Sequence, residues 1–552
     1  MSVAKRALHG WLLAPALACS LVAGCSDDDE GAAPIGLADG SVIPDSGRHD
    51  GGVTPSLDSG LDGAAPAPGD AGPGITDQKI FSAISATGHD RFFAVAYDAA
   101  GNIYAAGQTS ESTAAGTDYS FVLAKYSAAG VLDPAFGSGG FAFKNVAPGG
   151  GSVETARGVV VQASGKIVIA GNAEHRVFAG DAGAGPIAND ADVFLVRFNA
   201  NGQIDASFGI EGVVRVNLGD GVVTQPATLA DGGVPAPTLS GADAVWSLEQ
   251  TPEGKLVIHS ATRGLGANGI DGGLRTDTDF ALARFSVDGV LDTTFGSASA
   301  TPGIVRTDFG NTNASVRSAT ILSTGAIVGV GYSSNTVLTG SSTSAQNPIL
   351  YKVNADGTPD ATFGILDPVT APGVWHDFAR RDSKGAEAYG AALQGSKFVT
   401  LGYGPTPNTS GVGSDLVWLR FNADGSQDRT FGTDGVTFMD HAGFSENGRA
   451  ITLLPDNRVI GVGRGTPAPT PVPANPNDAP ADALIAVVTE NGEPDTTFAP
   501  HGIRLYDFGG PADHLWAVKV SPNKKQVAAV GIQTGTGATA NDNAALVILN
   551  LP

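Results

Sequence analysis

The sequence predicts an all-β protein that folds as a seven-bladed β-propeller with four antiparallel strands in each blade. Three observations predict this fold. A twelve-residue phrase returns six times, three short apolar strands return seven times in a fixed order around it, and one strand at the start of the repeat region can complete the last blade. Repeats of this kind are typical of arrays in which each unit packs against its neighbours.

The twelve-residue phrase, which we call the marker, contains Gly, then Asp three residues later, then Phe three residues after that. Its clearest copy is FNADGSQDRTFG at residues 421–432. The repeated residues of the six copies are Gly130, Asp133, Phe136; Gly202, Asp205, Phe208; Gly289, Asp292, Phe295; Gly357, Asp360, Phe363; Gly425, Asp428, Phe431; and Gly492, Asp495, Phe498. Successive marker glycines are 72, 87, 68, 68 and 67 residues apart, a spacing that suits one four-stranded blade per unit.

Three strands precede each marker and one follows it. The first two are joined by a short turn with Gly or Asn, such as Ala100-Gly101-Asn102, which supplies the positive φ of a tight hairpin. The third, such as DLVWLRF at 415–421, is apolar almost throughout, as expected for a strand that is covered on both faces. Each of these strands occurs seven times. The fourth strand occurs only six times, at 140–146, 212–218, 303–309, 373–378, 435–440 and 502–508.

The missing fourth strand is at the other end of the repeat region. Residues 74–81 (GITDQKIF) occupy the position of a fourth strand immediately before the first unit. We expect this N-terminal strand to complete the seventh blade, since a ring closed in this way leaves no open sheet edge. The alternative is two stacked β-domains.

The marker residues have two interpretations. Asp can accept backbone N–H groups in its turn, and Phe can fill a blade or the gap between two blades. Residues 354–360 and 422–428 also resemble part of a calcium loop, which makes Asp356, Asp360 and Asp428 candidate calcium ligands. Because every blade has to build the same turn, the structural interpretation is favoured. No other cofactor is expected.

The patterns F-N-A-D-G-x-x-D-x-T-F-G and G-K-I-V-x-A-G resemble the delta-60 repeat, a β-propeller-like repeat of exported bacterial proteins. The resemblance extends over residues 74–552. The sixth copy departs from the pattern with Ala499 in place of Gly, and the last unit has no marker. The resemblance implies a propeller and a cell-envelope location, but no established reaction and no catalytic residue.

The N-terminus predicts export and lipid anchoring. Lys5 and Arg6 precede an apolar stretch, which ends in LVAGC at residues 21–25. This string resembles a bacterial lipobox, which implies cleavage before Cys25 and acylation of that residue. We therefore expect a lipoprotein signal peptide at 1–24, a disordered acidic Gly/Pro/Ala tether at 25–73 and the propeller at 74–552. The anchor would hold the protein at the outer membrane or the periplasmic face.

Composition limits the possible partners and chemistry. The formal net charge of −23 opposes binding to nucleic acid. The two cysteines, Cys19 and Cys25, both lie at the N-terminus, so the propeller has no disulfide. The nine histidines form no H-E-x-x-H motif, and neither a G-x-S-x-G motif nor a P-loop is present. We assign no catalytic residue from the sequence.

The predicted function is a monomeric binding or scaffold module that engages a protein or glycan. The loops between the second and third strands vary most and are expected to share one face with the linker 219–243. These loops are 108–119, 172–192, 261–278, 332–347, 403–414, 464–482 and 532–543. The alternative is a polysaccharide hydrolase or lyase with its site at the mouth of the central channel. Converging carboxylates, His, Arg or Tyr at that mouth would favour the enzyme.

Overall fold

A computed structural model describes residues 76–85, 88–113, 116–147, 154–176, 189–219, 222–224, 238–240, 243–263, 277–308, 314–333, 347–364, 374–376, 386–404, 414–441, 445–467, 480–536 and 541–552. The predicted signal peptide, the tether and Cys25 lie outside these residues. Within them, no helix is long and apolar enough to cross a membrane.

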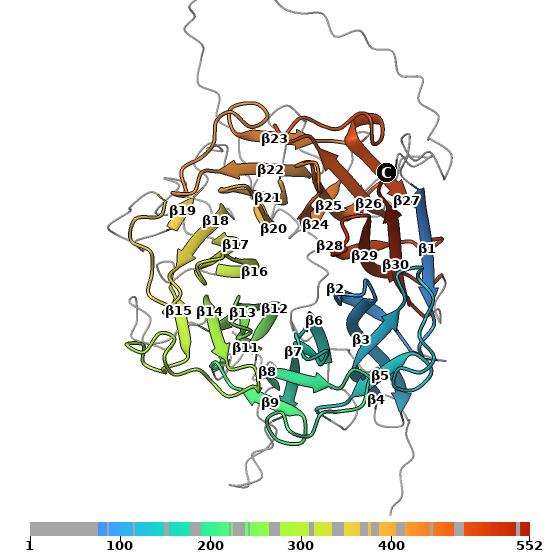
Figure 1. Cartoon of the computed structure of the whole chain (residues 1–552), viewed down its shortest axis with the longest axis vertical. Helices are drawn as coiled ribbons and strands as arrows, with labels where there is room; N and C mark the ends of the chain where they lie inside the picture. The colour runs from blue at the N-terminus through green and yellow to red at the C-terminus, as the bar shows by residue number, and fades with distance from the viewer. Residues whose placement is uncertain are drawn as a thin grey trace, which may run out of the picture.

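Seven four-stranded antiparallel sheets surround a central channel, which confirms the predicted seven-bladed propeller (Figure 1). Blade 1 contains β2 (Arg91–Tyr97), β3 (Ile103–Thr113), β4 (Gly116–Tyr126) and β5 (Phe141–Lys144). Blade 2 contains β6 (Glu154–Val161), β7 (Ile167–Arg176), β8 (Asn189–Phe198) and β9 (Val213–Val216). Blade 3 contains β12 (Ala244–Gln250), β13 (Leu256–Arg263), β14 (Thr278–Phe285) and β15 (Ile304–Thr307).

The remaining blades repeat this order. Blade 4 contains β16 (Ala314–Ile321), β17 (Ile327–Ser333), β18 (Asn347–Val353) and β19 (Val374–His376). Blade 5 contains β20 (Glu387–Gln394), β21 (Lys397–Gly404), β22 (Asp415–Phe421) and β23 (Val436–Met439). Blade 6 contains β24 (Glu446–Leu453), β25 (Val459–Gly465), β26 (Asp482–Val488) and β27 (Ile503–Tyr506). Blade 7 contains β28 (His514–Val520), β29 (Gln526–Gln533), β30 (Asn543–Asn550) and β1 (Thr76–Ser82).

The two ends of the repeat region close the ring, as the sequence predicts. Strand β1 pairs antiparallel with β30 over seven residues, from Thr76 opposite Asn550 to Ser82 opposite Ala544. Figure 1 shows β1 as the outermost strand beside β30. The N-terminal strand therefore covers an edge that β30 would otherwise expose.

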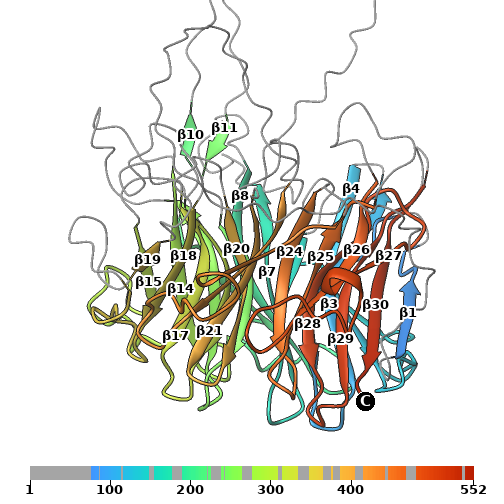
Figure 2. The same cartoon turned by 90° about the horizontal axis from the view of Figure 1, so that it is seen from above.

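Two local features differ from the sequence-based prediction. Residues 108–119 were expected to form a loop, but β3 and β4 continue as a paired hairpin until Thr113 is opposite Gly116. Within the linker 219–243, β10 (Val222–Thr224) and β11 (Thr238–Ser240) form a two-stranded ribbon on the loop side of the blades (Figure 2). The sequence analysis did not predict either pairing, because the residues involved lack the apolar run of the repeated strands. Most of the other predicted loops lie outside the described residues.

The apolar core consists of seven clusters, and each cluster fills the space between two neighbouring blades. The marker Phe is buried in six of them; Phe208, for example, lies in the cluster shared by blades 2 and 3 and is 0% exposed. The cluster between blades 7 and 1 has no marker Phe, and Ile80 of β1 packs against it instead. Each blade therefore depends on both neighbours for its core.

The marker Asp joins the turn to its own blade. Oδ1 of Asp428 accepts the backbone N–H of Thr430 at 3.1 Å, while Oδ2 accepts from Arg420 Nε at 2.7 Å and from Lys397 Nζ at 2.6 Å. The other five copies have the same turn bond and a Lys or Arg partner. Burial opposes the charged form, but these donors hold the pKa of Asp428 well below its ordinary value.

The last marker residue links one blade to the next. The N–H of Gly432 donates to the carbonyl of Asn491 in the following marker at 2.7 Å, and Gly432 has φ +52°. Ala499 occupies this position in the sixth copy. It has φ −162° because blade 7 has no marker to receive such a bond. The departure from Gly at this position thus follows from the missing seventh marker.

We expect Gly432→Ala to destabilise the propeller by about 1–3 kcal/mol, since a side chain would be held at positive φ. Its Cβ would also lie 2.1 Å from Oγ1 of Thr437. Urea unfolding of the variant measures this loss. The matched control is Ala499→Gly, which should change stability by less than about 1 kcal/mol. Equal effects of the two substitutions would contradict the proposed link between markers.

Candidate functional site

Each innermost strand contains a β-bulge at the same position. In β24, for example, the pairing with β25 shifts between Gly448 and Ala450, so that Arg449 is the extra residue. A bulge redirects the side chain of its extra residue. The seven bulged residues are Phe93, Arg157, Trp246, Arg317, Tyr389, Arg449 and Trp516, and together they line a cavity of about 50 Å³ in the channel. We call this set the channel ring.

The channel ring alternates aromatic and arginine side chains. The guanidinium carbon of Arg317 lies 4.1 Å from the ring centre of Trp246 and 4.4 Å from that of Tyr389. Arg449 lies 4.4 Å from Tyr389 and 4.6 Å from Trp516. Arg157 lies 4.6 Å from Trp246 and 4.9 Å from Phe93. Each cation is therefore held between two aromatic rings.

Two aromatic members of the ring are in direct contact. Phe93 and Trp516, from blades 1 and 7, lie 5.5 Å apart in an edge-to-face arrangement. The contact falls where β1 closes the propeller.

The bulge requires a very small residue on the neighbouring strand. A Cβ on Gly402 would lie 1.6 Å from the carbonyl oxygen of Glu387, which the bulge pushes toward β21. Six second strands have Gly here, and blade 3 has Ser260, whose hydroxyl donates to the carbonyl of Ala244 at 2.9 Å. The repeated Gly near the end of the second strand is thus explained by the channel ring.

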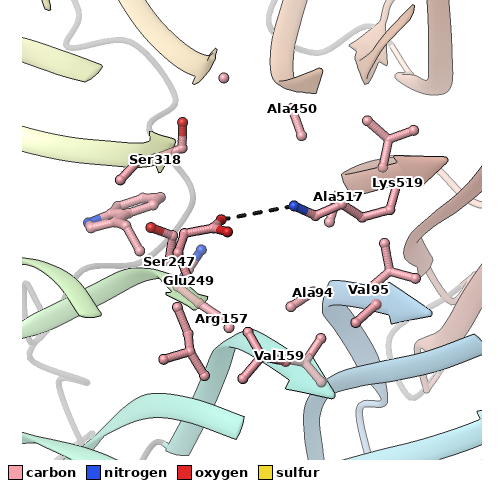
Figure 3. Close-up of a pocket in the computed structure, with 18 of the residues that line it drawn as sticks. Ala94, Val95, Arg157, Val159, Ser247, Glu249, Ser318, Ala450, Ala517 and Lys519 are labelled. Atoms are coloured by element: carbon pink, nitrogen blue, oxygen red, sulfur yellow. Dashed lines mark ion pairs between the residues drawn. The ribbon is translucent and has the colours of Figure 1, made fainter. Parts of the chain in front are cut away.

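Beyond the channel ring, the channel widens into a vestibule of about 570 Å³. It extends from the ring to the far ends of the innermost strands, near Tyr97 and Pro522, and so away from the loops between second and third strands. Small residues directly follow every ring residue: Ala94, Gly158, Ser247, Ser318, Gly390, Ala450 and Ala517. This layer leaves room for a ligand (Figure 3).

The vestibule wall carries one pair of opposite charges. Glu249 of β12 and Lys519 of β28 approach to 3.9 Å across the channel, as the dashed line in Figure 3 shows. Burial raises the pKa of Glu249, and the charge of Lys519 opposes this rise. The Oγ atoms of Ser247 and Ser318 also line the vestibule, and neither has a hydrogen-bond partner among the described residues.

The arginines of the channel ring differ in their neighbours. Nη2 of Arg317 donates to Oε2 of Glu387 in the next blade at 2.9 Å, and both side chains are buried. Glu387 lies two residues before the bulge of its strand. The equivalent residue after Arg449 is His514. Burial and the positive charges of Arg464 and Arg449 hold the pKa of His514 well below its ordinary value, so this imidazole is neutral.

Arg449 has unused hydrogen-bonding capacity. Its Nε and Nη2 atoms are buried and have no hydrogen-bond partner within the part of the chain that the structure describes. The indole Nε1 of neighbouring Trp516 is also buried and has no hydrogen-bond partner among the described residues. A buried donor without an acceptor costs about 1–3 kcal/mol. Because Nε and Nη2 can donate together to one carboxylate, this side of the channel ring is suited to an acidic group.

The marker residues do not contribute to the channel ring. They form turns at the ends of the blades, and the candidate calcium ligands among them already have partners. Oδ1 of Asp356 accepts the N–H of Thr358 at 2.9 Å, and Asp360 pairs with Lys352 at 2.9 Å. Asp428 pairs with Lys397 and Arg420.

Sequence reasoning missed the channel ring altogether. The signal appears when the first strands are aligned on the small residue that follows the bulge, because the preceding position then reads F, R, W, R, Y, R, W.

One family of known proteins that matches parts of the chain is described as a β-propeller. The family described as "Domain of unknown function (DUF5122) beta-propeller" matches residues 162–208, 272–295 and 323–363. No curated protein matches the chain. Among solved structures, a protein of unknown function from Dyadobacter fermentans is 12% identical with a TM-score of 0.39, covering 87% of this chain and 100% of its own. The polysaccharide lyase Uly1 is 10% identical with a TM-score of 0.45, covering 85% and 91%. A NanB sialidase mutant from Streptococcus pneumoniae is 9% identical with a TM-score of 0.35, covering 86% and 70%.

We expect Arg317→Gln to destabilise the protein by about 3–5 kcal/mol, because Glu387 would keep a buried charge without its cation. Chemical denaturation at neutral pH measures the change. Arg449→Gln is the comparison at an equivalent bulge, and it should cost clearly less because it breaks no ion pair with a buried carboxylate. If Arg449→Gln were the more damaging change, this account of the ring would be wrong.

Proposed function

We propose that this protein is an exported, lipid-anchored binding protein of the cell envelope, and that its propeller holds an acidic group of a ligand at the channel ring. The observation that carries the proposal is that Nε and Nη2 of Arg449 are buried without a hydrogen-bond partner among the described residues. The guanidinium stacks on the ring of Trp516, whose indole Nε1 also lacks a partner there. An acceptor at this position would satisfy donors that otherwise cost free energy on burial.

A glycan that carries carboxylates is the ligand class that the channel suits best. The vestibule volume of about 570 Å³ lies in the range of small-molecule sites, and the hydroxyls of Ser247 and Ser318 offer hydrogen bonds to a polar ligand. The acidic group would bind at the channel ring, and the neighbouring sugar units would occupy the vestibule. A protein partner at the loop face is the other binding mode that we propose from the variable loops.

A second candidate function is a polysaccharide hydrolase or lyase. The specific observation in its favour is the pair of Glu249 and Lys519, since a carboxyl group with a raised pKa opposite an amine can exchange protons with a bound substrate. The Arg and Tyr side chains of the channel ring are among the residue types that the sequence analysis associated with an enzyme, but we infer that the channel ring serves binding. Its arginines are fixed between aromatic rings and remain charged at neutral pH, so they attract an anion but do not transfer protons.

The binding proposal predicts that the protein binds an oligouronate more tightly than a neutral oligosaccharide of equal length, as calorimetric titration would show. We expect Arg449→Gln to weaken oligouronate binding at least about tenfold, since a hydrogen bond to a charged group contributes about 1.5–3 kcal/mol. Arg429→Gln is the control, because Arg429 is exposed and pairs with Asp434 outside the channel. Equal affinity for the two sugars, or no effect of Arg449→Gln, would refute the proposal. Product formation that Glu249→Gln abolishes would favour the enzyme instead.

Lipid anchoring makes a separate prediction. Replacing Cys25 by Ala should move the protein from the membrane fraction to the soluble fraction of the envelope, because the acylated thiol would be lost. Fractionation and immunoblotting of the two forms measure this. Retention of Cys25→Ala in the membrane fraction would count against a lipid anchor at this residue.

A further inference from the structure

A group of three carboxylates lies where blade 5 connects to blade 6, outside the channel. Asp415 begins β22, Asp440 follows β23 and Glu446 begins β24. One oxygen from each residue lies within 4.8 Å of the other two. The backbone brings them together, since the N–H of Glu446 donates to the carbonyl of Ser414 at 2.6 Å and Oγ of Ser414 donates to the carbonyl of Glu446 at 3.0 Å.

Four other blades have a carboxylate at the position of Glu446, and there it accepts backbone N–H groups, whereas blades 4 and 5 have Ala314 and Ala386. Glu154 accepts from Val146 at 3.0 Å and from Ala147 at 2.6 Å. Asp243 accepts from Leu218, Asp90 from Ile84 and Ser85, and Asp513 from Phe508 and Gly510. In these blades the carboxylate fixes the connection between two blades.

Glu446 is the exception. It is 0% exposed, and neither of its oxygens has a hydrogen-bond partner among the described residues. The backbone N–H of His441 lies near this carboxyl group and favours its charged form, but it does not meet hydrogen-bond geometry with either oxygen. Burial, followed by the negative charges of Asp440 and Asp415, raises the pKa of Glu446 to about 10. Among the described residues, this buried carboxyl group faces two other carboxylates and lacks the backbone donors that its equivalents in other blades have.

We propose that Asp415, Asp440 and Glu446 bind a divalent cation, with calcium as the best match. Carboxylate oxygens are the ligands that calcium prefers, at about 2.3–2.6 Å, so two oxygens on opposite sides of the ion lie about 4.8 Å apart. The spacing of the three carboxylates fits this limit. Water and backbone oxygens would complete the six to eight ligands that calcium takes.

A bound ion would connect two neighbouring blades. The three ligands come from the third strand of blade 5, the end of its fourth strand and the first strand of blade 6. The ion would supply at this junction the stabilisation that backbone N–H groups supply at Glu154 and Asp513. Ligand binding to the folded state alone raises the stability of that state.

Calcium titration of the full, metal-stripped chain tests the proposal, by calorimetry and by thermal unfolding. We expect saturable binding with a dissociation constant of about 10⁻⁴ M or tighter, together with a higher Tm in calcium than in EDTA. The variants Glu446→Gln and Asp415→Asn should each weaken calcium binding at least about tenfold, which corresponds to about 1.4 kcal/mol. A magnesium titration tests selectivity, and we expect weaker binding because magnesium demands a tighter octahedral shell.

The matched control is Asp507→Asn. Asp507 belongs to a similar group with Asp482 and Asp513 between blades 6 and 7, but Asp513 there has backbone and hydroxyl donors. This variant should keep the calcium affinity of the wild type. Unfolding in EDTA shows whether Glu446→Gln folds normally, and Asp415→Asn gives an independent measurement if it does not. Absence of calcium binding by the wild type, or unchanged binding by both site variants, would overturn the proposal.

Discussion

The structure depends on packing between neighbouring blades. Each sheet buries its faces only against the sheets beside it, and seven separate clusters of apolar residues fill the seven gaps. A linear array of such sheets would leave two faces uncovered. The pairing of β1 with β30 removes this cost, because it completes blade 7 and brings its core against blade 1. The central channel and the channel ring exist because the seven blades form a closed circle.

The architecture could be predicted because its signals are local. The marker recurs within single turns, and the third strands are apolar almost throughout, so the pattern can be recognised within most units by itself. The departure at Ala499 also has a local sign, and the absence of a following marker explains it. The last unit has no fourth strand, and residues 74–81 have the pattern of one. This predicted that the N-terminal strand completes the last blade, as it does in the structure.

The channel ring could not be predicted in the same way. Its members are one residue per blade, so neighbours such as Arg449 and Trp516 are far apart in sequence and meet only when the strands are aligned by their bulges. Bulges have no signal of their own apart from the Gly on the adjoining strand. The partners of the channel-ring arginines could not be predicted from the sequence either. Glu387 stabilises Arg317, whereas the equivalent position after Arg449 holds a neutral His514. Likewise, nothing in the residue type separates Glu446 from Glu154; their partners differ only in three dimensions.

The direct contact between Phe93 and Trp516 is a consequence of parity. A strict alternation of two residue types can return to its starting point only in a ring with an even number of members, and this propeller has seven blades. One pair of like neighbours is therefore unavoidable, and here it falls at the seam where the chain closes. This mismatch removes the rotational equivalence of the blades. The channel wall therefore differs on the side where Phe93 and Trp516 meet. A ligand in the channel can distinguish this side from the others, which allows a nearly symmetric scaffold to bind an asymmetric molecule in a single orientation.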